Sequence, residues 1–179
     1  MKLLKKIALG LLALVALWLL VAAFIPGATH YEKSITIQAP TQRVWQEMNS
    51  LRKIDQWSPW NAFDPQMKKT WSGETGKVGE SMQWEGNEKA GKGTQTLTAI
   101  DPKGKTLELE MLFLTPYESE AKATYTLVPE QEGSKVTWGF DSTIPYPFTV
   151  IKLFMDMEKS IGPDFQRGLE DLKRRAEKP

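Results

Sequence analysis

The chain has 179 residues, with 23 basic and 22 acidic side chains, one histidine and no cysteine. The lack of cysteine excludes disulfides, cysteine nucleophiles and lipid-modified cysteines. The nearly balanced charge provides no basic field for nucleic acid, and the lone His30 excludes a histidine triad or a histidine-based metal site.

An apolar run opens the chain. Ile7 to Ile25 carry no charge over 19 residues, and a helix needs roughly 20 apolar residues to cross a bilayer. Lys2, Lys5 and Lys6 precede the run, so the positive-inside rule keeps the N-terminus in the cytoplasm. In a bacterium, this predicts a single-pass anchor in the inner membrane, with the rest of the chain in the periplasm. A cleaved signal peptide is the alternative, although the sequence around Pro26 makes a poor cleavage site.

The chain is therefore expected to have three parts. These are an anchor at residues 1–25, a linker at residues 26–31 and an exported domain at residues 32–179. Alternation over residues 32–38 predicts a strand, and two short helices are expected at 42–48 and 50–56.

An aromatic loop follows the two short helices. Residues 55–65 read DQWSPWNAFDP, and the prolines in this stretch disfavour both a regular helix and a central strand. The loop nevertheless carries Trp57, Trp60 and Phe63. So much apolar area in a loop indicates that these side chains are not exposed to water but pack over another part of the protein.

Six further strands are predicted from alternating apolar and polar residues. The clearest places Leu107, Leu109, Met111 and Phe113 on one face. Such alternation is typical of an antiparallel sheet with one apolar and one solvated face. The predicted strands span residues 69–73, 79–86, 92–101, 105–115, 118–129 and 135–144.

The last element is a long amphipathic helix. Apolar residues recur with a period of 3.6 over residues 151–176, and Gly162-Pro163 is expected to bend or split the helix. Only this helix is long enough to cover the apolar face of the sheet. The element order thus predicts an α+β fold in which the sheet curls around the C-terminal helix.

Both this order and several motifs resemble the START-like (SRPBCC) superfamily, and within it the bacterial polyketide cyclase/dehydrase and lipid-transport family. The likeness spans about residues 31–177 and rests on SITIQAPTQRVWQEM, WSPW, GETGKVGESMQWEG, VTWGF and IGPDFQRGLEDLK. The resemblance implies a helix-grip fold, with a seven-stranded antiparallel sheet around the C-terminal helix and a cavity between them. Family members bind sterols, lipids and polyketides, and some catalyse cyclisation or dehydration.

The resemblance also places the aromatic loop near one end of the cavity, as a lid or wall or simply as a plug of the core. The inward strand positions and the helix stripe complete a predicted lining, which either contacts a ligand or fills the core. The predicted ligand-binding residues are Trp57, Trp60, Phe63, Trp71, Met82, Trp84, Leu109, Met111, Phe113, Tyr125, Trp138, Phe140 and Met155.

No catalytic residue, metal site or cofactor is predicted. His30 falls in the expected linker, and Glu158 is either a buried anchor for a ligand or a residue at the edge of the helix stripe. The predicted partners are a hydrophobic small molecule or lipid, and the membrane through residues 7–25. Two alternatives remain open: an enzyme built on Tyr125 and an acidic residue, or an interaction module with a filled core.

Overall fold

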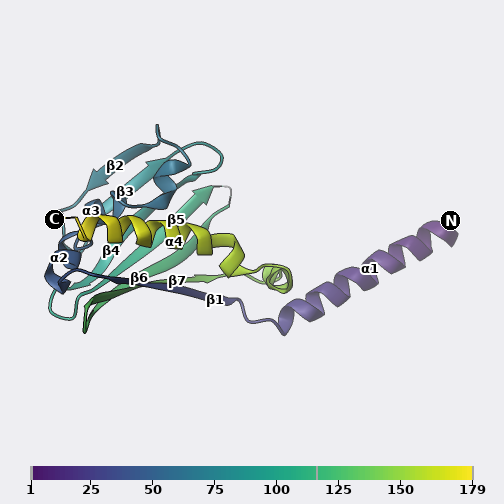
Figure 1. The fold of residues 1–179 in the computed structure, drawn as a ribbon. Coiled ribbons are helices and arrows are strands. Elements are labelled where there is room, and N and C mark those ends of the chain that lie inside the picture. The colour runs from purple at the N-terminus through teal and green to yellow at the C-terminus, as the bar shows by residue number, and fades with distance from the viewer. Residues whose placement is uncertain (1, 116, 179) are drawn as a thin grey trace.

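The computed structural model describes residues 2–115 and 117–178 as an N-terminal helix followed by an α+β domain (Figure 1). The helix and the domain lie end to end, and the C-terminus lies at the end of the domain away from α1. The elements are α1 (Lys2–Ala23), β1 (Ala28–Ile37), α2 (Thr41–Gln46), α3 (Leu51–Asp55), the 3-10 helix η1 (Pro59–Ala62), β2 (Lys68–Ser72), β3 (Ser81–Glu85), β4 (Lys92–Asp101), β5 (Thr106–Thr115), β6 (Ser119–Glu130), β7 (Gly133–Thr143), the 3-10 helix η2 (Phe148–Leu153) and α4 (Met157–Ala176).

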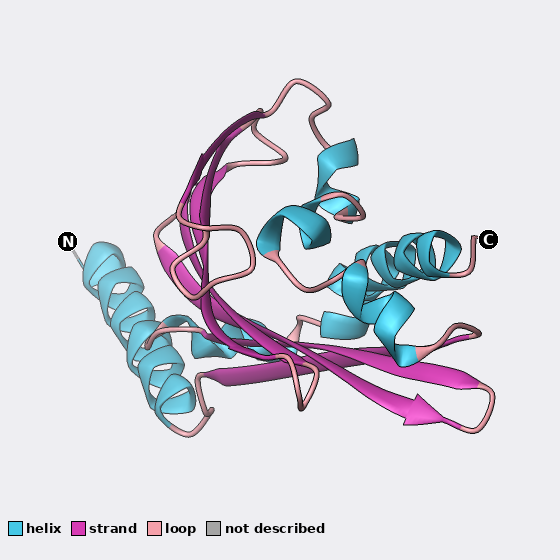
Figure 2. Cartoon of the chain, turned by 90° about the vertical axis from the view of Figure 1, so that its left-hand side faces the viewer, coloured by secondary structure: helices cyan, strands magenta, loops and turns pink. Residues whose placement is uncertain are grey.

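The domain has the predicted helix-grip fold. Its seven strands form one antiparallel sheet in the order β1-β7-β6-β5-β4-β3-β2. Figure 2 shows the sheet curled around the helices that lie on its concave side. The pairing register places Leu107 beside Tyr125 and Tyr125 beside Trp138, so the alternating residues of β5, β6 and β7 share one apolar face.

The first strand begins earlier than predicted. Residues 28–31, which we expected to form most of the linker, pair with β7 instead, and His30 lies opposite Asp141. His30 is exposed, as expected, but its Nδ1 lies 2.7 Å from Oδ1 of Asp141. This hydrogen bond raises the pKa of His30 above its ordinary value. Only residues 24–27 separate α1 from the sheet.

The break in the C-terminal helical region was predicted at the wrong place. α4 runs through Pro163, whereas the interruption falls at residues 154–156, between η2 and α4. Asp156 caps α4, because its side chain accepts a hydrogen bond from the backbone N–H of Lys159 at 3.2 Å. Gly162 lies close to β1, where a Cβ would come within 2.8 Å of the Tyr31 hydroxyl. Contact with the sheet therefore holds the helix together across a proline that removes only one backbone hydrogen bond.

A buried acid that we did not predict fixes α3 to the sheet. Glu80 has no exposed surface, and its carboxylate accepts hydrogen bonds from the backbone N–H groups of Leu51, Arg52 and Gly76 at 3.0, 3.1 and 2.8 Å. The first two belong to the N-terminal turn of α3, where backbone N–H groups lack helical partners and a negative charge is favoured. Glu80 thus positions the helix that leads into the aromatic loop.

Candidate functional site

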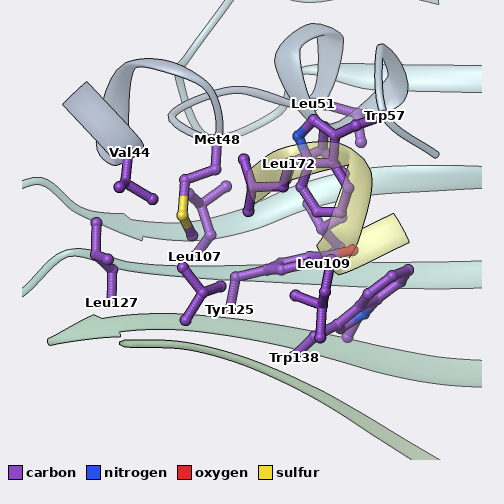
Figure 3. Packing of buried hydrophobic residues seen from close by; sticks show 14 of the residues in the cluster. Val44, Met48, Leu51, Trp57, Leu107, Leu109, Tyr125, Leu127, Trp138 and Leu172 are labelled. Atoms are coloured by element: carbon purple, nitrogen blue, oxygen red, sulfur yellow. The ribbon is translucent and has the colours of Figure 1, made fainter. Parts of the chain in front are cut away.

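A cavity of about 270 Å³ lies between the concave face of the sheet and the segments formed by α3, η1 and α4. It is partly open to the surface, and its lining is mostly aromatic and aliphatic. Beside the cavity, buried apolar side chains from α2, α4 and the strands form a core cluster, which includes Val44, Leu107, Leu127 and Leu172 (Figure 3). The lining residues are Ile54, Asp55, Trp57, Ser58, Trp60, Asn61, Met67, Met82, Trp84, Ala90, Gln95, Met111, Phe113, Ala123, Tyr125, Trp138, Phe140, Ile161 and Phe165.

The two tryptophans of the WSPW stretch form one wall of this cavity. Trp57 is 2% exposed, and its ring meets those of Tyr125 and Trp138 edge-on, with centroids 5.8 and 5.7 Å apart. The Trp57 indole N–H donates to the carbonyl of Glu47 at 3.0 Å, which fixes the ring. Trp60 meets Trp138 edge-on at 5.2 Å. The apolar surfaces of Trp57 and Trp60 therefore form part of the cavity wall.

A close approach between η1 and α4 brings this wall into place. At Gly168 a Cβ would lie 3.1 Å from Cδ of Pro59 and 3.0 Å from Cζ3 of Trp138. A side chain at this position would make a tight contact with both groups, so one of them would have to shift. The proline of WSPW and the glycine of QRGLEDLK thus define one contact, which neither motif reveals alone.

The opposite wall depends on a glycine in β4. A Cβ on Gly93 would collide with the indole of Trp84 and with the carbonyl of Leu112, so only glycine lets the Trp84 ring lie against the strand. The Trp84 N–H donates to the carbonyl of Ala90 at 3.1 Å, and its ring meets Phe113 edge-on at 5.7 Å.

Two aromatic side chains of the lining, Tyr125 on β6 and Trp138 on β7, carry hydrogen-bond donors. No hydrogen bond joins the Tyr125 hydroxyl to another described residue, and the buried indole N–H of Trp138 has none in the described part of the chain. Burial raises the pKa of Tyr125 well above its ordinary value, so the hydroxyl keeps its proton. The Trp138 N–H is enclosed by its neighbours, so the Tyr125 hydroxyl is the donor that we expect an acceptor on a bound molecule to use.

The charged group at the cavity edge is compensated. Oδ1 of Asp55 accepts a hydrogen bond from Nζ of Lys69 at 2.6 Å, and the same ammonium donates to Oδ1 of Asn61 at 2.6 Å. The Asn61 amide in turn donates to the backbone carbonyl of Asp55 at 2.6 Å. The lining therefore presents no unpaired charge among the described residues, a property that suits an uncharged molecule.

The structure brings most of the predicted lining residues to the cavity: Trp57, Trp60, Met82, Trp84, Met111, Phe113, Tyr125, Trp138 and Phe140. Whether these residues contact a ligand stays a prediction. Phe63, Trp71, Leu109 and Met155 do not line it.

Each of these four side chains lies outside the cavity for a local reason. Leu109 is 1% exposed and packs in the filled core, and the ring of Trp71 lies under the guanidinium of Arg52 at 4.5 Å. Phe63 follows η1 and is half-buried away from the cavity. Met155 falls in the break before α4 rather than on a helix.

Glu158 is a residue at the edge of the helix stripe and not a cavity group. Its side chain is 63% exposed, with Oε2 accepting from the Tyr31 hydroxyl at 2.6 Å and Oε1 from Nζ of Lys33 at 2.9 Å. These two hydrogen bonds, with that of Tyr31 the stronger, lower the pKa of Glu158. They fasten the start of α4 to β1.

Several lining residues were missed from the sequence. Ile161 and Phe165 lie on the stripe of α4 that was predicted to face the sheet, so helical periodicity already pointed to them. Phe165 stacks on Trp138 with centroids 4.0 Å apart. Ala90 and Met67 come from loops without a periodic pattern and gave no signal.

Comparison with known proteins places this geometry in context. A family model described as polyketide cyclase/dehydrase and lipid transport matches residues 28–177. No match is found among curated protein sequences.

Solved structures share the fold at low sequence identity. Truncated norcoclaurine synthase from Thalictrum flavum has a TM-score of 0.64 at 13% identity, over 87% of this chain and 97% of that one. A solution structure from Thermobifida fusca scores 0.60 at 21% identity, over 82% and 92% of the two chains. The major latex-like protein 151 of Panax ginseng scores 0.59 at 16% identity, over 83% and 97%.

Proposed function

Because this chain belongs to the polyketide cyclase/dehydrase and lipid transport family, we propose that it is a membrane-anchored domain that binds a compact, uncharged hydrophobic molecule. The cavity carries this proposal, since it combines an apolar lining with the Tyr125 hydroxyl as a polar group and no unpaired charge among the described residues. Ligand pockets in proteins have the same character: mostly apolar walls with a few placed polar groups.

The size of the cavity narrows the class of ligand. An apolar cavity of about 150 Å³ accommodates benzene, and this one measures about 270 Å³. A molecule of two fused rings, or a branched chain of similar bulk, fits within it, whereas a whole phospholipid does not. We therefore expect the ligand to be a small polyketide-like or isoprenoid-like compound, or part of a lipid.

The anchor and location form the second part of the proposal. α1 is long and apolar enough to cross a membrane, and three lysines precede its apolar run. These features support a single pass through the inner membrane, with the domain from about residue 28 onward on the periplasmic side. The linker is then shorter than the sequence suggested.

Thermal unfolding of the full chain in lipid nanodiscs tests the binding proposal. Naphthyl methyl ketone at about a hundred times its dissociation constant is expected to stabilise the domain by about 2.7 kcal/mol. For a domain of this size, that corresponds to a rise in Tm of roughly 5–10 °C. Naphthalene sulfonate, which has a similar shape and a charge, is the matched control and is expected to give no rise. Equal shifts with both compounds, or none with any apolar compound in a panel of this size, would contradict the proposal.

Tyr125→Phe separates the role of the free hydroxyl from that of the cavity. The variant is expected to bind naphthyl methyl ketone about five- to tenfold more weakly, because one hydrogen bond contributes about 1 kcal/mol. Affinity for naphthalene, which has no acceptor, is expected to stay the same. Isothermal titration of both compounds measures the difference, and an equal loss for the two would assign Tyr125 a purely structural role.

An enzyme is the second candidate, and Asp55 is the observation that favours it. Its side chain is 17% exposed, and the residue lines the cavity. The carboxylate is, however, held by Lys69 at 2.6 Å, so it is engaged before any substrate arrives. Asp55→Asn is expected to leave ligand affinity unchanged in either case. Only an enzyme that uses this carboxylate would lose turnover in the variant.

A further inference from the structure

Five apolar side chains lie exposed at the end of the domain next to α1. Monomeric soluble surfaces seldom gather so large an apolar patch without a partner. We call them the η2 patch: Tyr146, Phe148, Ile151, Leu153 and Phe154, which are 57, 59, 53, 62 and 85% exposed.

The η2 patch is fixed to the last turns of α1. Oγ1 of Thr149, which is 3% exposed, donates a hydrogen bond to the carbonyl of Ala22 at 2.8 Å. The ring of Phe148 meets that of Trp18 edge-on, with centroids 6.3 Å apart. Figure 1 shows η2 beside the end of α1 where the chain enters β1. The patch therefore has a fixed position along the axis of α1, beside its last turns.

Lys152 strengthens the same junction. Its Nζ donates to the carbonyls of Pro26 and Ala28 at 2.7 and 2.6 Å, so η2 holds the short connection between α1 and β1 and the first residue of β1. This connection spans only residues 24–27. The domain consequently cannot swing the patch far from the helix end.

The position of the patch identifies what covers it. The side chains of α1 are exposed around the whole helix except at Ala22 and a few partly covered neighbours, and such a helix is expected to be surrounded by lipid. A surface fixed beside its final turn lies where the helix leaves the acyl chains, the layer in which tryptophan and tyrosine gather. Trp18 and Tyr146 lie at this level.

We propose that the η2 patch inserts into the outer interfacial layer of the bilayer crossed by α1. This inference rests on the membrane anchoring in the proposed function and adds a second point of contact with lipid. Phe140 and Ile161 line the cavity from β7 and α4, the two elements that flank η2. Phe140 pairs with Tyr31 near the start of β1, so these two lining residues and the patch lie at the same end of the domain, and insertion of the patch would bring that end close to the lipid.

The absence of cysteine allows a direct test with single-cysteine variants. Ile151→Cys and Phe154→Cys are labelled with an environment-sensitive fluorophore in the full chain, which is reconstituted into phosphatidylethanolamine and phosphatidylglycerol vesicles. Val128→Cys, 50% exposed on β6 at the end of the sheet away from α1, is the matched control. Vesicles with brominated acyl chains are expected to quench most of the fluorescence at 151 and 154, and none at 128.

Two results would overturn the η2 patch as a lipid contact. Water-like emission at 151 and 154 would place the patch in solvent, and blue-shifted emission without bromine quenching would show that protein covers it. A carbonate wash of the same vesicles reports on anchoring separately. Retention of the chain with unquenched labels would refute the patch alone, whereas loss of the chain would refute both the patch and the anchor.

Discussion

Replacing Met111 by tryptophan is expected to abolish binding of naphthyl methyl ketone, with an affinity loss of well over tenfold. Met111 is half-buried and lines the cavity from β5, between Gln95 on β4 and Ala121 on β6. A rigid indole in this place would take up a large part of a cavity of about 270 Å³. The added bulk costs about 1–3 kcal/mol of folding free energy by overpacking, so circular dichroism and thermal unfolding must accompany the titration.

Met155→Trp is the matched control for this variant. It is the same substitution at a half-buried position outside the cavity lining, and it is expected to bind the ketone with the affinity of the unmodified chain. If the Met111 variant folds and binds within twofold of that affinity, the ligand lies elsewhere.

Glu80→Ala is expected to lower the free energy of unfolding by about 3–5 kcal/mol, a large fraction of the stability of most domains. The substitution removes a fully buried carboxylate that accepts hydrogen bonds from three backbone N–H groups, one of them buried and two partly buried. An unpaired buried donor costs about 1–3 kcal/mol. Urea unfolding followed by tryptophan fluorescence measures the change.

Two further variants test whether the loss of stability comes from the buried hydrogen bonds of Glu80. Glu85→Ala, on an exposed side chain of neighbouring β3, is expected to change stability by less than about 0.5 kcal/mol. Glu80→Gln keeps the shape and one acceptor oxygen, so its cost is expected to fall between the two. A loss in Glu80→Gln as large as in Glu80→Ala would contradict this expectation and would show that a single acceptor oxygen does not hold these N–H groups.

The strands were predictable because half-buried antiparallel strands alternate. In β5, the face that carries Leu107 and Leu109 is buried, and Glu108 and Glu110 lie on the other face. The start of β1 could not be found this way, since residues 28–31 gain their strand conformation by pairing with β7. Pairing between distant segments leaves no local pattern.

The end of the chain shows the same limit. A 3.6-residue period continues across the break between η2 and α4, so periodicity alone predicted one helix. The sequence did contain the signal for the true start, because Asp156 is a favoured N-cap residue. We placed the break at Gly162-Pro163 because proline disfavours the interior of a helix. Contact with β1 outweighs the one hydrogen bond that the proline removes there.

Much of the cavity lining could be predicted from the inward positions of strands. Trp84, Tyr125 and Trp138 follow directly from alternation. The boundary between filled core and open cavity could not, because it depends on how far α3 and α4 approach the sheet. Gly168 sets the approach of α4, and Gly93 lets the Trp84 ring lie against β4. A glycine in a sequence does not say what it lies against.

Three methionines, Met67, Met82 and Met111, line the cavity from separate segments of the chain. An unbranched thioether side chain adjusts its shape at little cost, whereas the tryptophans around it are fixed by their neighbours. We therefore expect the cavity to select ligands by volume and to tolerate differences in their shape. Related chains could then bind a different ligand of equal volume without a change of fold.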